Sequence, residues 1–387
     1  MSRIAVIAGV AQAPLVDGRI PDAPSILGVQ ADVAKRAAAD AGISLAEVDG
    51  LMVSGTWNLP GPGILPTVAV GEYLGLRPRY MNSSNIGGSS FELFAAHAAM
   101  AIESGYCDTV LVTYGSLQRT ESSRTLVGRP PALMMQHESP FGLPAPVGGY
   151  AMSAMRHMYQ FGTTQEQLAA IAVQAREWAA LNPEATKRDP ITVDDVLASP
   201  MVTDPLHRLD CCLVTDGAAA LIVTTEDRAR ASGVTGVKIA GYAEQQSHWT
   251  MTQMDDLVVT PAAATGPRAL SMAGLTVSDV DVIEVYDSFT ITTLLQLEDL
   301  GFCEKGGGGR LVTEVGIGPK GGLAVNTHGG GLSYGHPGMY GMFILIEAVR
   351  QLRGEAGDRQ VGNAEVALVS GMGGVLSSAA TTVLVTA

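Results

Sequence analysis

The segment DAGISLAEVDGLMV, residues 40–53, aligns without gaps with MAGLTVSDVDVIEV, residues 272–285. Both copies hold an Ala-Gly pair, a Ser or Thr before an acidic turn, and an apolar run at the end. A glycine after an apolar helix favours a helix end, and a capped turn before an apolar run favours a buried strand. The alignment therefore predicts one helix–turn–strand unit that occurs twice in an α/β chain.

A second, weaker internal similarity extends the repeat. AAHAAMAIESGYCDTVLVTYG, residues 95–115, resembles IEAVRQLRGEAGDRQVGNAEVALVSG, residues 346–371, because each reads as a helix, a polar break and an apolar strand. Chance recurrence in an Ala-rich chain is the alternative explanation. The two internal similarities predict an N-terminal half over residues 1–225 and a C-terminal half over residues 226–387.

A segment of different composition separates the repeated parts, roughly residues 116–206. It contains RPPALMMQHESPFGLPAPVGG, residues 129–149, which predicts an irregular loop, and TTQEQLAAIAVQAREWAAL, residues 163–181, which predicts a helix. An excursion of this length favours a wall or lid of a binding site, and its methionines suit a lipophilic ligand. An ordinary covering loop fits the composition equally well.

Bulk composition excludes several classes of protein. The 387 residues are 47% hydrophobic and 16% charged, and the formal net charge of −14 argues against nucleic acid as a partner. No run of about 18 apolar residues predicts a membrane span, and the first residues are too weakly basic for a signal peptide. We expect a cytoplasmic protein. The four cysteines form no Cys-x-x-Cys pair, so no metal site is expected.

One glycine-rich stretch is a candidate for chemistry. NTHGGGLSYGHPGMYG, residues 326–341, contains six glycines and two histidines. Glycines allow a backbone to approach a ligand closely, and a histidine beside them commonly serves acid–base chemistry or hydrogen bonding. His336 is therefore the first candidate site residue.

Five motifs together resemble the thiolase superfamily, and most closely its sterol-carrier-protein-X and lipid-transfer-protein branch. They are DPLHRLDCCLVTDGAAALIV (204–223), EVYDSF (284–289), LEDLGFC (297–303), GGGLSYGHPG (329–338) and EAVRQLRGEAGDRQV (347–361). The resemblance implies a duplicated five-layered α/β/α/β/α fold with an inserted loop domain. It also implies a homodimer and a small companion protein with an OB fold and a zinc ribbon.

The chain departs from the family where thiolases keep their catalytic cysteines. The nucleophile position falls on Asn85 in MNSSNIGGSSFELFAAHAAMAIESG, residues 81–105. The two places for a second catalytic cysteine read YDSF, residues 286–289, and SGMGG, residues 370–374. Only the family's oxyanion-hole histidine remains, at His336. The resemblance is therefore to the branch that lacks the catalytic cysteines, the steroid side-chain aldolases. These enzymes cleave β-hydroxyacyl-CoA thioesters by retro-aldol chemistry.

That resemblance assigns roles to individual residues. It implies a lyase in which coenzyme A is part of the acyl-CoA substrate and no cofactor is bound covalently. The implied catalytic residues are Tyr340, Tyr242 and His336, and the implied residues of the thioester pocket are Tyr286, Asn85, Tyr334 and Asp287. A half-buried aromatic with a backbone partner is the ordinary alternative for each tyrosine. The alternative functions are a thiolase or acetyl-CoA acetyltransferase, and a non-catalytic subunit that binds acyl-CoA or lipid.

Overall fold

A computed structural model describes residues 3–55, 64–121 and 132–387. In these residues a nine-stranded mixed sheet has the order β3-β2-β4-β7-β1-β8-β11-β10-β9. Its first five strands come from the N-terminal half: β1 (Ala5–Gln12), β2 (Gly50–Val53), β3 (Tyr80–Asn82), β4 (Thr109–Ser116) and β7 (Gly217–Thr225). The others come from the C-terminal half: β8 (Val237–Gln246), β9 (Val282–Val285), β10 (Val366–Gly373) and β11 (Ser378–Thr386).

The strand pairings occur twice in the same pattern. In the N-terminal half β1 pairs antiparallel with β7, β7 antiparallel with β4, and β4 parallel with β2. In the C-terminal half β8 pairs antiparallel with β11, β11 antiparallel with β10, and β10 parallel with β9. The aligned segments 40–53 and 272–285 end in the equivalent strands β2 and β9, so the sequence repeat corresponds to a structural one.

Two close contacts repeat with the same spacing. A Cβ on Gly9 of β1 would lie 2.1 Å from the carbonyl oxygen of Ala37, and one on Gly241 of β8 would lie 2.1 Å from that of Ala269. The separation in sequence between Gly9 and Gly241 equals that between Ala37 and Ala269. It is also the offset between the two aligned segments, which start at residues 40 and 272. Each half therefore presses a strand directly onto the backbone of its outer helix, and only glycine fits there.

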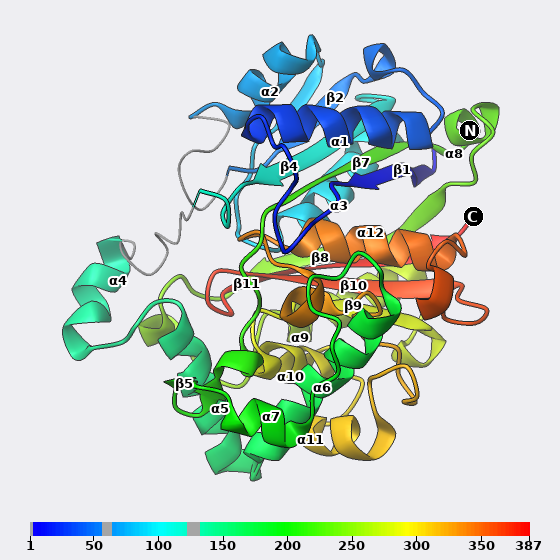
Figure 1. The fold of residues 1–387 in the computed structure, drawn as a ribbon. Coiled ribbons are helices and arrows are strands. Elements are labelled where there is room, and N and C mark those ends of the chain that lie inside the picture. The colour runs from blue at the N-terminus through cyan, green and yellow to red at the C-terminus, as the bar shows by residue number, and fades with distance from the viewer. Residues whose placement is uncertain (1–2, 56–63, 122–131) are drawn as a thin grey trace.

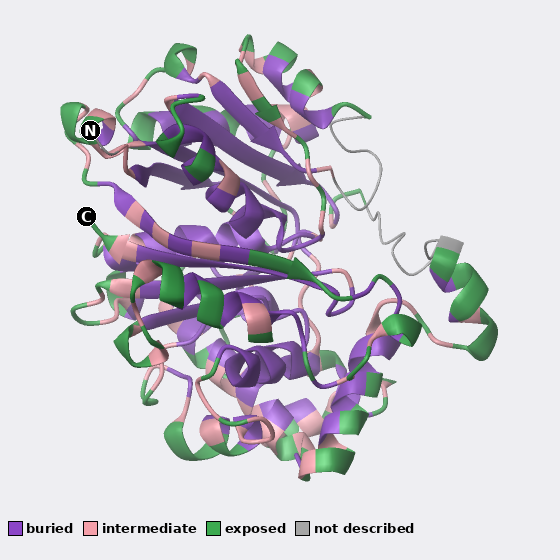
Figure 2. Ribbon diagram, turned by 180° about the vertical axis from the view of Figure 1, so that it is seen from behind, coloured by how far each residue is buried: buried purple, intermediate pink, exposed green. Residues whose placement is uncertain are grey.

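Figure 1 shows the layers that the two halves make. Helices α1 (Ile26–Asp40) and α2 (Pro66–Leu74) cover the outer face of the N-terminal strands, and α9 (Ala262–Ala273) covers that of the C-terminal strands. Helices α3 (Ser90–Glu103) and α12 (Gly341–Leu352) lie between the two sets of strands and contact both. This is the expected α/β/α/β/α order, and burial is greatest in the central layers (Figure 2).

The excursion between β4 and β7 is more helical than predicted. Helix α6 (Gln165–Leu181) confirms the helix expected at residues 163–181, and Thr164 caps it by accepting a hydrogen bond from the Gln167 amide. The prediction of an irregular loop over residues 129–149 is wrong in part, because α4 (Ala132–His137) lies within it and α5 (Val147–Phe161) begins there. Residues 122–131 lie outside the described part.

The remaining elements complete the C-terminal half and the excursion. They are α7 (Val193–Ala198), the hairpin β5 (Met201–Thr203) and β6 (Leu206–His207), α8 (Glu226–Ala231), α10 (Thr290–Asp299) and α11 (Gly308–Arg310). Among the described residues, no helix combines the length and the apolar character that a bilayer-crossing segment needs.

Candidate active site

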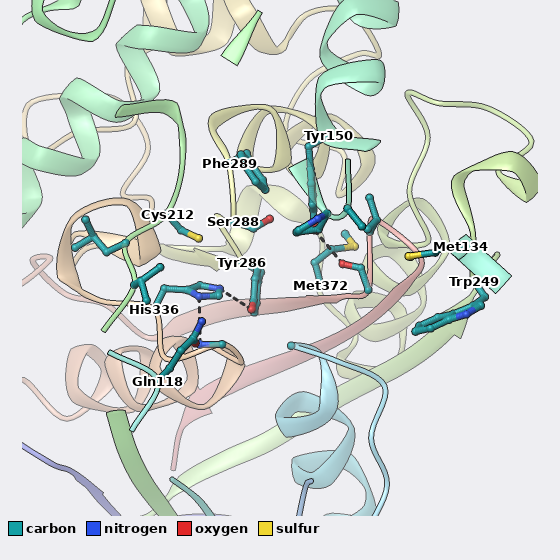
Figure 3. A pocket seen from close by; sticks show the side chains of 18 residues that line it. Gln118, Met134, Tyr150, Cys212, Trp249, Tyr286, Ser288, Phe289, His336 and Met372 are labelled. Atoms are coloured by element: carbon teal, nitrogen blue, oxygen red, sulfur yellow. Dashed lines mark hydrogen bonds between the residues drawn. The ribbon is translucent and has the colours of Figure 1, made fainter. Parts of the chain in front are cut away.

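A cavity of about 230 Å³ opens where the central helix α3, the strand β10 and the excursion meet. Figure 3 shows that its two ends differ in chemistry. His336, Cys212 and Tyr286 lie toward one end, and Met134 and Trp249 lie toward the other. The cavity therefore joins a polar end, where bonds can be polarised, to an apolar end that suits a hydrocarbon group.

The polar end is built around a hydrogen bond between two side chains. The hydroxyl of Tyr286 lies 2.8 Å from Nε2 of His336, and the two rings meet edge to face with centroids 5.5 Å apart. Both side chains line the cavity. The structure thus brings together two of the predicted site residues, one from the loop after β9 and one from the glycine-rich loop.

Backbone contacts hold both partners in place. The Tyr286 amide donates to the Ser370 carbonyl oxygen at 3.0 Å, which continues the pairing of β9 with β10. The His336 amide donates to Oγ1 of Thr215 at 3.0 Å. Asp287 accepts hydrogen bonds from the amides of Gly331 and Leu332, at 2.6 and 3.1 Å. Asp287 does not line the main cavity among the described residues, and it ties the glycine-rich loop to the end of β9 instead.

Burial sets the charge state of the pair. It lowers the pKa of His336 to about 4, so the imidazole is neutral at physiological pH. It raises the pKa of Tyr286 well above the usual value near 10, against a hydrogen bond from the Tyr340 backbone that acts to lower it. Burial also raises the pKa of Asp287 to about 7, against the two amide hydrogen bonds. Tyr286 is therefore a neutral phenol that can donate.

The tautomer of His336 follows from its second nitrogen. The Gly338 amide donates to Nδ1 at 3.4 Å, so Nδ1 is an acceptor and the ring hydrogen belongs on Nε2. Nε2 then donates to the Tyr286 oxygen. With the His336 ring hydrogen donated to its oxygen, Tyr286 keeps its own hydroxyl hydrogen for a group in the cavity, and polarisation makes that hydrogen a better donor.

Tyr340 and Tyr334 lie behind the cavity wall rather than on it. Tyr340 has no exposed surface, and its hydroxyl is hydrogen bonded to Nε2 of His328. Its ring stacks on His336 at 5.9 Å and meets Tyr286 edge to face at 5.9 Å. Tyr334 is 2% exposed and packs on His328 at 5.1 Å. The position of Tyr340 suits support of the pair better than contact with a ligand.

Tyr242 is remote from the pair. It lies in β8 opposite Thr382, and burial together with the charges of Glu103 and Glu244 raises its pKa. Glu103 ends α3, whereas the cavity lies beyond the first residue of that helix, and a helix of this length spans about 20 Å. No described contact joins Tyr242 to the cavity lining, so the structure gives its predicted catalytic role no support.

Asn85 occupies the loop before α3 but not the cavity lining. Its side chain is exposed, accepts from the Gly87 amide at 3.0 Å and donates to the Gly55 carbonyl at 3.4 Å. Gly88, three residues later, is the part of this loop that lines the cavity. Asn85 therefore shapes the turn into α3.

Sequence reasoning missed Cys212. Its motif, DPLHRLDCCLVTDG, was matched to the family without a role for the thiol, yet the residue lines the polar end beside His336 and Tyr286 (Figure 3). The position results from a loop that crosses the cavity, with the Cys212 amide bonded to the Ser288 carbonyl and the Leu213 amide to that of Gly331. No local sequence signal predicts such a crossing. Tyr150 and Gln118, from the excursion, also line the cavity.

Comparison with known proteins agrees with this architecture. Residues 243–386 match the family described as thiolase C-terminal domain-like. An acetyl-CoA acetyltransferase of Methanothermobacter thermautotrophicus is 36% identical, over 88% of this chain and 89% of the relative. A 17-hydroxy-3-oxo-4-pregnene-20-carboxyl-CoA lyase of Mycobacterium tuberculosis is 33% identical, over 90% and 92%.

A solved structure agrees over almost the whole chain. The structure described as an Ltp2-ChsH2(DUF35) aldolase superposes with a TM-score of 0.87 at 30% identity, and covers 99% of this chain and 98% of its own. The two sequence relatives and the solved structure thus match this chain over most of their own length. The chain belongs to the thiolase superfamily, in the branch that contains the lipid-transfer-protein aldolases.

Proposed function

We propose that this chain cleaves a β-hydroxyacyl-CoA by retro-aldol chemistry to a ketone or aldehyde and a shortened acyl-CoA. The observation that carries the proposal is the Tyr286–His336 pair at the polar end of the cavity, combined with Asn85 where thiolases place a nucleophilic cysteine. The pair supplies a hydrogen-bond donor for an enolate oxygen. Because Asn85 replaces the cysteine before α3, no thiolate at that position can form an acyl-enzyme, which suits a reaction through an enolate alone. The relatives named as lyase and aldolase support the same reaction.

The pair would act on the thioester oxygen. The proton of the β-hydroxyl passes to solvent water, the O–H electron pair forms the carbonyl of the leaving ketone or aldehyde, and the electron pair of the broken Cα–Cβ bond forms the enolate of the shortened acyl-CoA. One proton from water then returns at Cα, so the reaction as a whole consumes no proton. The hydroxyl of Tyr286 is placed to donate to the enolate oxygen, with His336 bonded behind it. The described lining contains hydroxyl, thiol, amide and imidazole groups but no carboxylate. Stabilisation of the enolate is therefore the main task of the site.

The apolar end would hold the acyl group. Met134 and Trp249 line it, and such side chains accept bulky hydrocarbon without fixing its shape. A steroid acyl group agrees with the name of the lyase relative. The test is a panel of β-hydroxyacyl-CoA thioesters, assayed for ketone or aldehyde and for shortened acyl-CoA. Turnover that requires added free CoA would contradict the proposal.

An acyltransferase is the second candidate, because Cys212 places a thiol in the same cavity. A covalent mechanism would transfer the acyl group to that sulfur and then to a second CoA or a carbon nucleophile. The relative named acetyl-CoA acetyltransferase favours this reading to the same degree as the lyase favours the first. A non-catalytic subunit, the third possibility raised by the sequence, would bind acyl-CoA and leave it intact.

Replacing Cys212 with alanine separates the two enzymes. We expect Cys212→Ala to keep turnover within a few-fold of the wild type, because the retro-aldol route makes no bond to sulfur. Cys303→Ala, which changes a partly exposed thiol outside the lining, is the matched control. Loss of activity in Cys212→Ala alone, with an acyl mass on the wild-type residue after incubation with acyl-CoA, would establish the acyltransferase. Alkylation is a poorer test, since an added group would fill the cavity.

We also propose that the chain forms a homodimer that works with a small companion protein, since the aldolase structure it resembles is named as a pairing of Ltp2 with ChsH2(DUF35). In the described residues β3 ends the sheet and pairs with β2 on one side only. An unpaired strand edge with exposed Met81 is a ready place for a second chain to add a strand.

Light scattering at micromolar concentration should therefore give twice the mass of the chain. Met81→Pro removes one backbone donor from the edge strand and should shift the mass toward the monomer, since proline interrupts strand addition. Val202→Pro, at an exposed position in the hairpin β5–β6, is the control. A monomeric wild type would contradict the dimer, and turnover unaffected by the companion protein would contradict its role in catalysis.

A further inference from the structure

A cluster of polar side chains is buried directly behind the cavity wall, between β9, the glycine-rich loop and α12. None of its members is more than 7% exposed, and hydrogen bonds or ion pairs connect them: Glu284, Thr327, His328, Tyr340, Glu347, Gln351 and Arg359. Buried polar groups of this number are costly unless their charges and hydrogen bonds balance.

Two of the charges balance each other. Nε and Nη2 of Arg359 each donate to the carboxylate of Glu347 at 2.9 Å. Burial acts to raise the pKa of Glu347, but the charges of His328 and Arg359 hold it below its usual range. Glu347 is therefore an ionised carboxylate whose cation is Arg359.

The cluster also has the spacing of a metal site, but several of its donor atoms are already hydrogen bonded to other side chains. Donor atoms of Glu284, His328 and Glu347 lie within 4.8 Å of one another. Both oxygens of Glu347 are already taken by Arg359, and Nε2 of His328 is taken by Tyr340. A guanidinium thus stands where a metal would supply positive charge, and a proton is the simpler counter-charge for the remaining carboxylate.

That remaining carboxylate is Glu284, which has no exposed surface. The nearest group that can carry positive charge is His328, whose Nδ1 lies 3.2 Å from Oε2 of Glu284, outside hydrogen-bond angles. Burial raises the pKa of Glu284. An unbalanced buried charge is strongly destabilising. For this pair to be neutral overall, it must carry one proton more than the single ring hydrogen of a neutral imidazole.

Either location of that proton has the same effect on Tyr340. If His328 is an imidazolium beside ionised Glu284, both ring nitrogens carry hydrogen. If Glu284 is the acid, the Nδ1 that faces it is left as an acceptor, and the ring hydrogen is on Nε2. Nε2 therefore donates to the Tyr340 oxygen in both cases. The cluster fixes the direction of this hydrogen bond.

Tyr340 connects the cluster to the reacting pair. Its ring stacks on His336 and meets Tyr286 edge to face, with both pairs of ring centroids 5.9 Å apart. A ring held at its hydroxyl end has little freedom to tilt, so the groups packed on its faces are held as well. Loss of the His328 contact would release the ring that sets the orientation of Tyr286 and His336.

We propose that His328, paired with Glu284, is a positioning residue that acts through the hydroxyl of Tyr340 on the Tyr286–His336 pair. The inference rests on the proposed function only in treating that pair as the reacting groups. It assigns Tyr340 a supporting role in place of the catalytic role predicted from the sequence, and it gives His328 a function that no motif indicated.

The first test needs no substrate. Protein labelled with ¹³C-histidine is titrated by NMR, and the His336 ring signal is followed in the wild type, His328→Gln and Tyr340→Phe. The glutamine cannot carry the shared proton, and the phenylalanine removes only the hydroxyl. In both variants we expect the His336 signal to move and its pKa to rise from about 4 toward the usual 6.5, because a loosened stack admits water. His97→Gln, on α3 away from the cluster, is the control.

The second test is a double-mutant cycle on turnover. We expect His328→Gln and Tyr340→Phe each to lower kcat about tenfold with KM little changed, and the double variant to be no worse than the poorer single one. Additive losses, or a wild-type His336 titration in folded variants, would overturn the inference. If His328→Gln does not fold, Tyr340→Phe alone decides the titration. A failure of retro-aldol turnover in the wild type would leave the NMR result standing, so the two proposals fail separately.

Discussion

Tyr286→Phe is expected to lower the turnover of a β-hydroxyacyl-CoA by about two to three orders of magnitude, the usual cost of losing one donor to a developing oxyanion. The change keeps the ring that packs on His336 and Tyr340 and removes only the hydroxyl. Binding of the acyl group should change little, because the apolar end of the cavity is untouched. The loss should therefore appear in kcat, measured as release of shortened acyl-CoA in single-turnover and steady-state assays.

Tyr242→Phe is the matched control for this prediction. It removes the same hydroxyl from a half-buried tyrosine of β8, toward the far end of α3 from the cavity. We expect its turnover to stay within two-fold of the wild type. A large loss in Tyr242→Phe and a small one in Tyr286→Phe would contradict the assignment and restore the roles first implied by family resemblance.

The second large effect concerns stability and Glu92. This residue is in the first turn of α3, is 1% exposed, and neither carboxyl oxygen has a hydrogen-bond partner among the described residues. It fits because two neighbours lack side chains: a Cβ on Gly341 or Gly371 would lie 2.5 or 2.1 Å from its Oε2. Burial raises the pKa of Glu92 from 4.5 to about 8, so the folded protein holds this acid protonated at neutral pH.

The sign of the effect on stability follows from proton linkage. Between pH 4.5 and about 8 the folded state keeps a proton that the unfolded chain has released, so the free energy of unfolding falls as pH rises. Over the whole window the loss amounts to about 5 kcal/mol, at about 1.4 kcal/mol per pH unit. Glu92→Gln carries no proton to lose. We expect it to match the wild type near pH 5 and to be more stable by several kcal/mol near pH 8.

Thermal or denaturant unfolding of both proteins from pH 5 to 9 measures this difference. Glu72→Gln, which neutralises an exposed carboxyl of α2, is the control and should leave the pH dependence unchanged. Parallel curves for wild type and Glu92→Gln would show that Glu92 has a partner or water that the structure does not contain.

The fold could be predicted from the sequence because the repeat and the motifs constrain the order and pairing of helices and strands. An ungapped repeat that ends in equivalent strands, and a glycine-rich loop at a helix start, constrain the backbone strongly. Tyr286 and His336, both predicted from these motifs, line one cavity, because Tyr286 directly follows β9 and His336 lies in the glycine-rich loop before α12.

The rest of the site could not be predicted in this way. Tyr340 is four residues from His336, yet as the residue that precedes α12 it turns its hydroxyl toward His328 and away from the cavity. Tyr242 lies in β8, and which end of the central helix that strand reaches depends on the assembled sheet. Cys212 reaches the cavity only because a long loop crosses it. Side-chain direction and long-range crossing are tertiary properties with no local signal.

The position of α3 and α12 has a consequence for how the chain folds. Every residue of α12 except Arg350 is buried, and both helices lie between the two sets of strands, with contacts to each. In the described part of the chain the strands themselves meet across the centre at only two residue pairs, Val6 with Lys238 and Ile7 with Val237. A fragment that held either repeat alone would therefore leave one helix with an uncovered apolar side. The two repeats should therefore fold together, and the molecule should melt as a single cooperative unit.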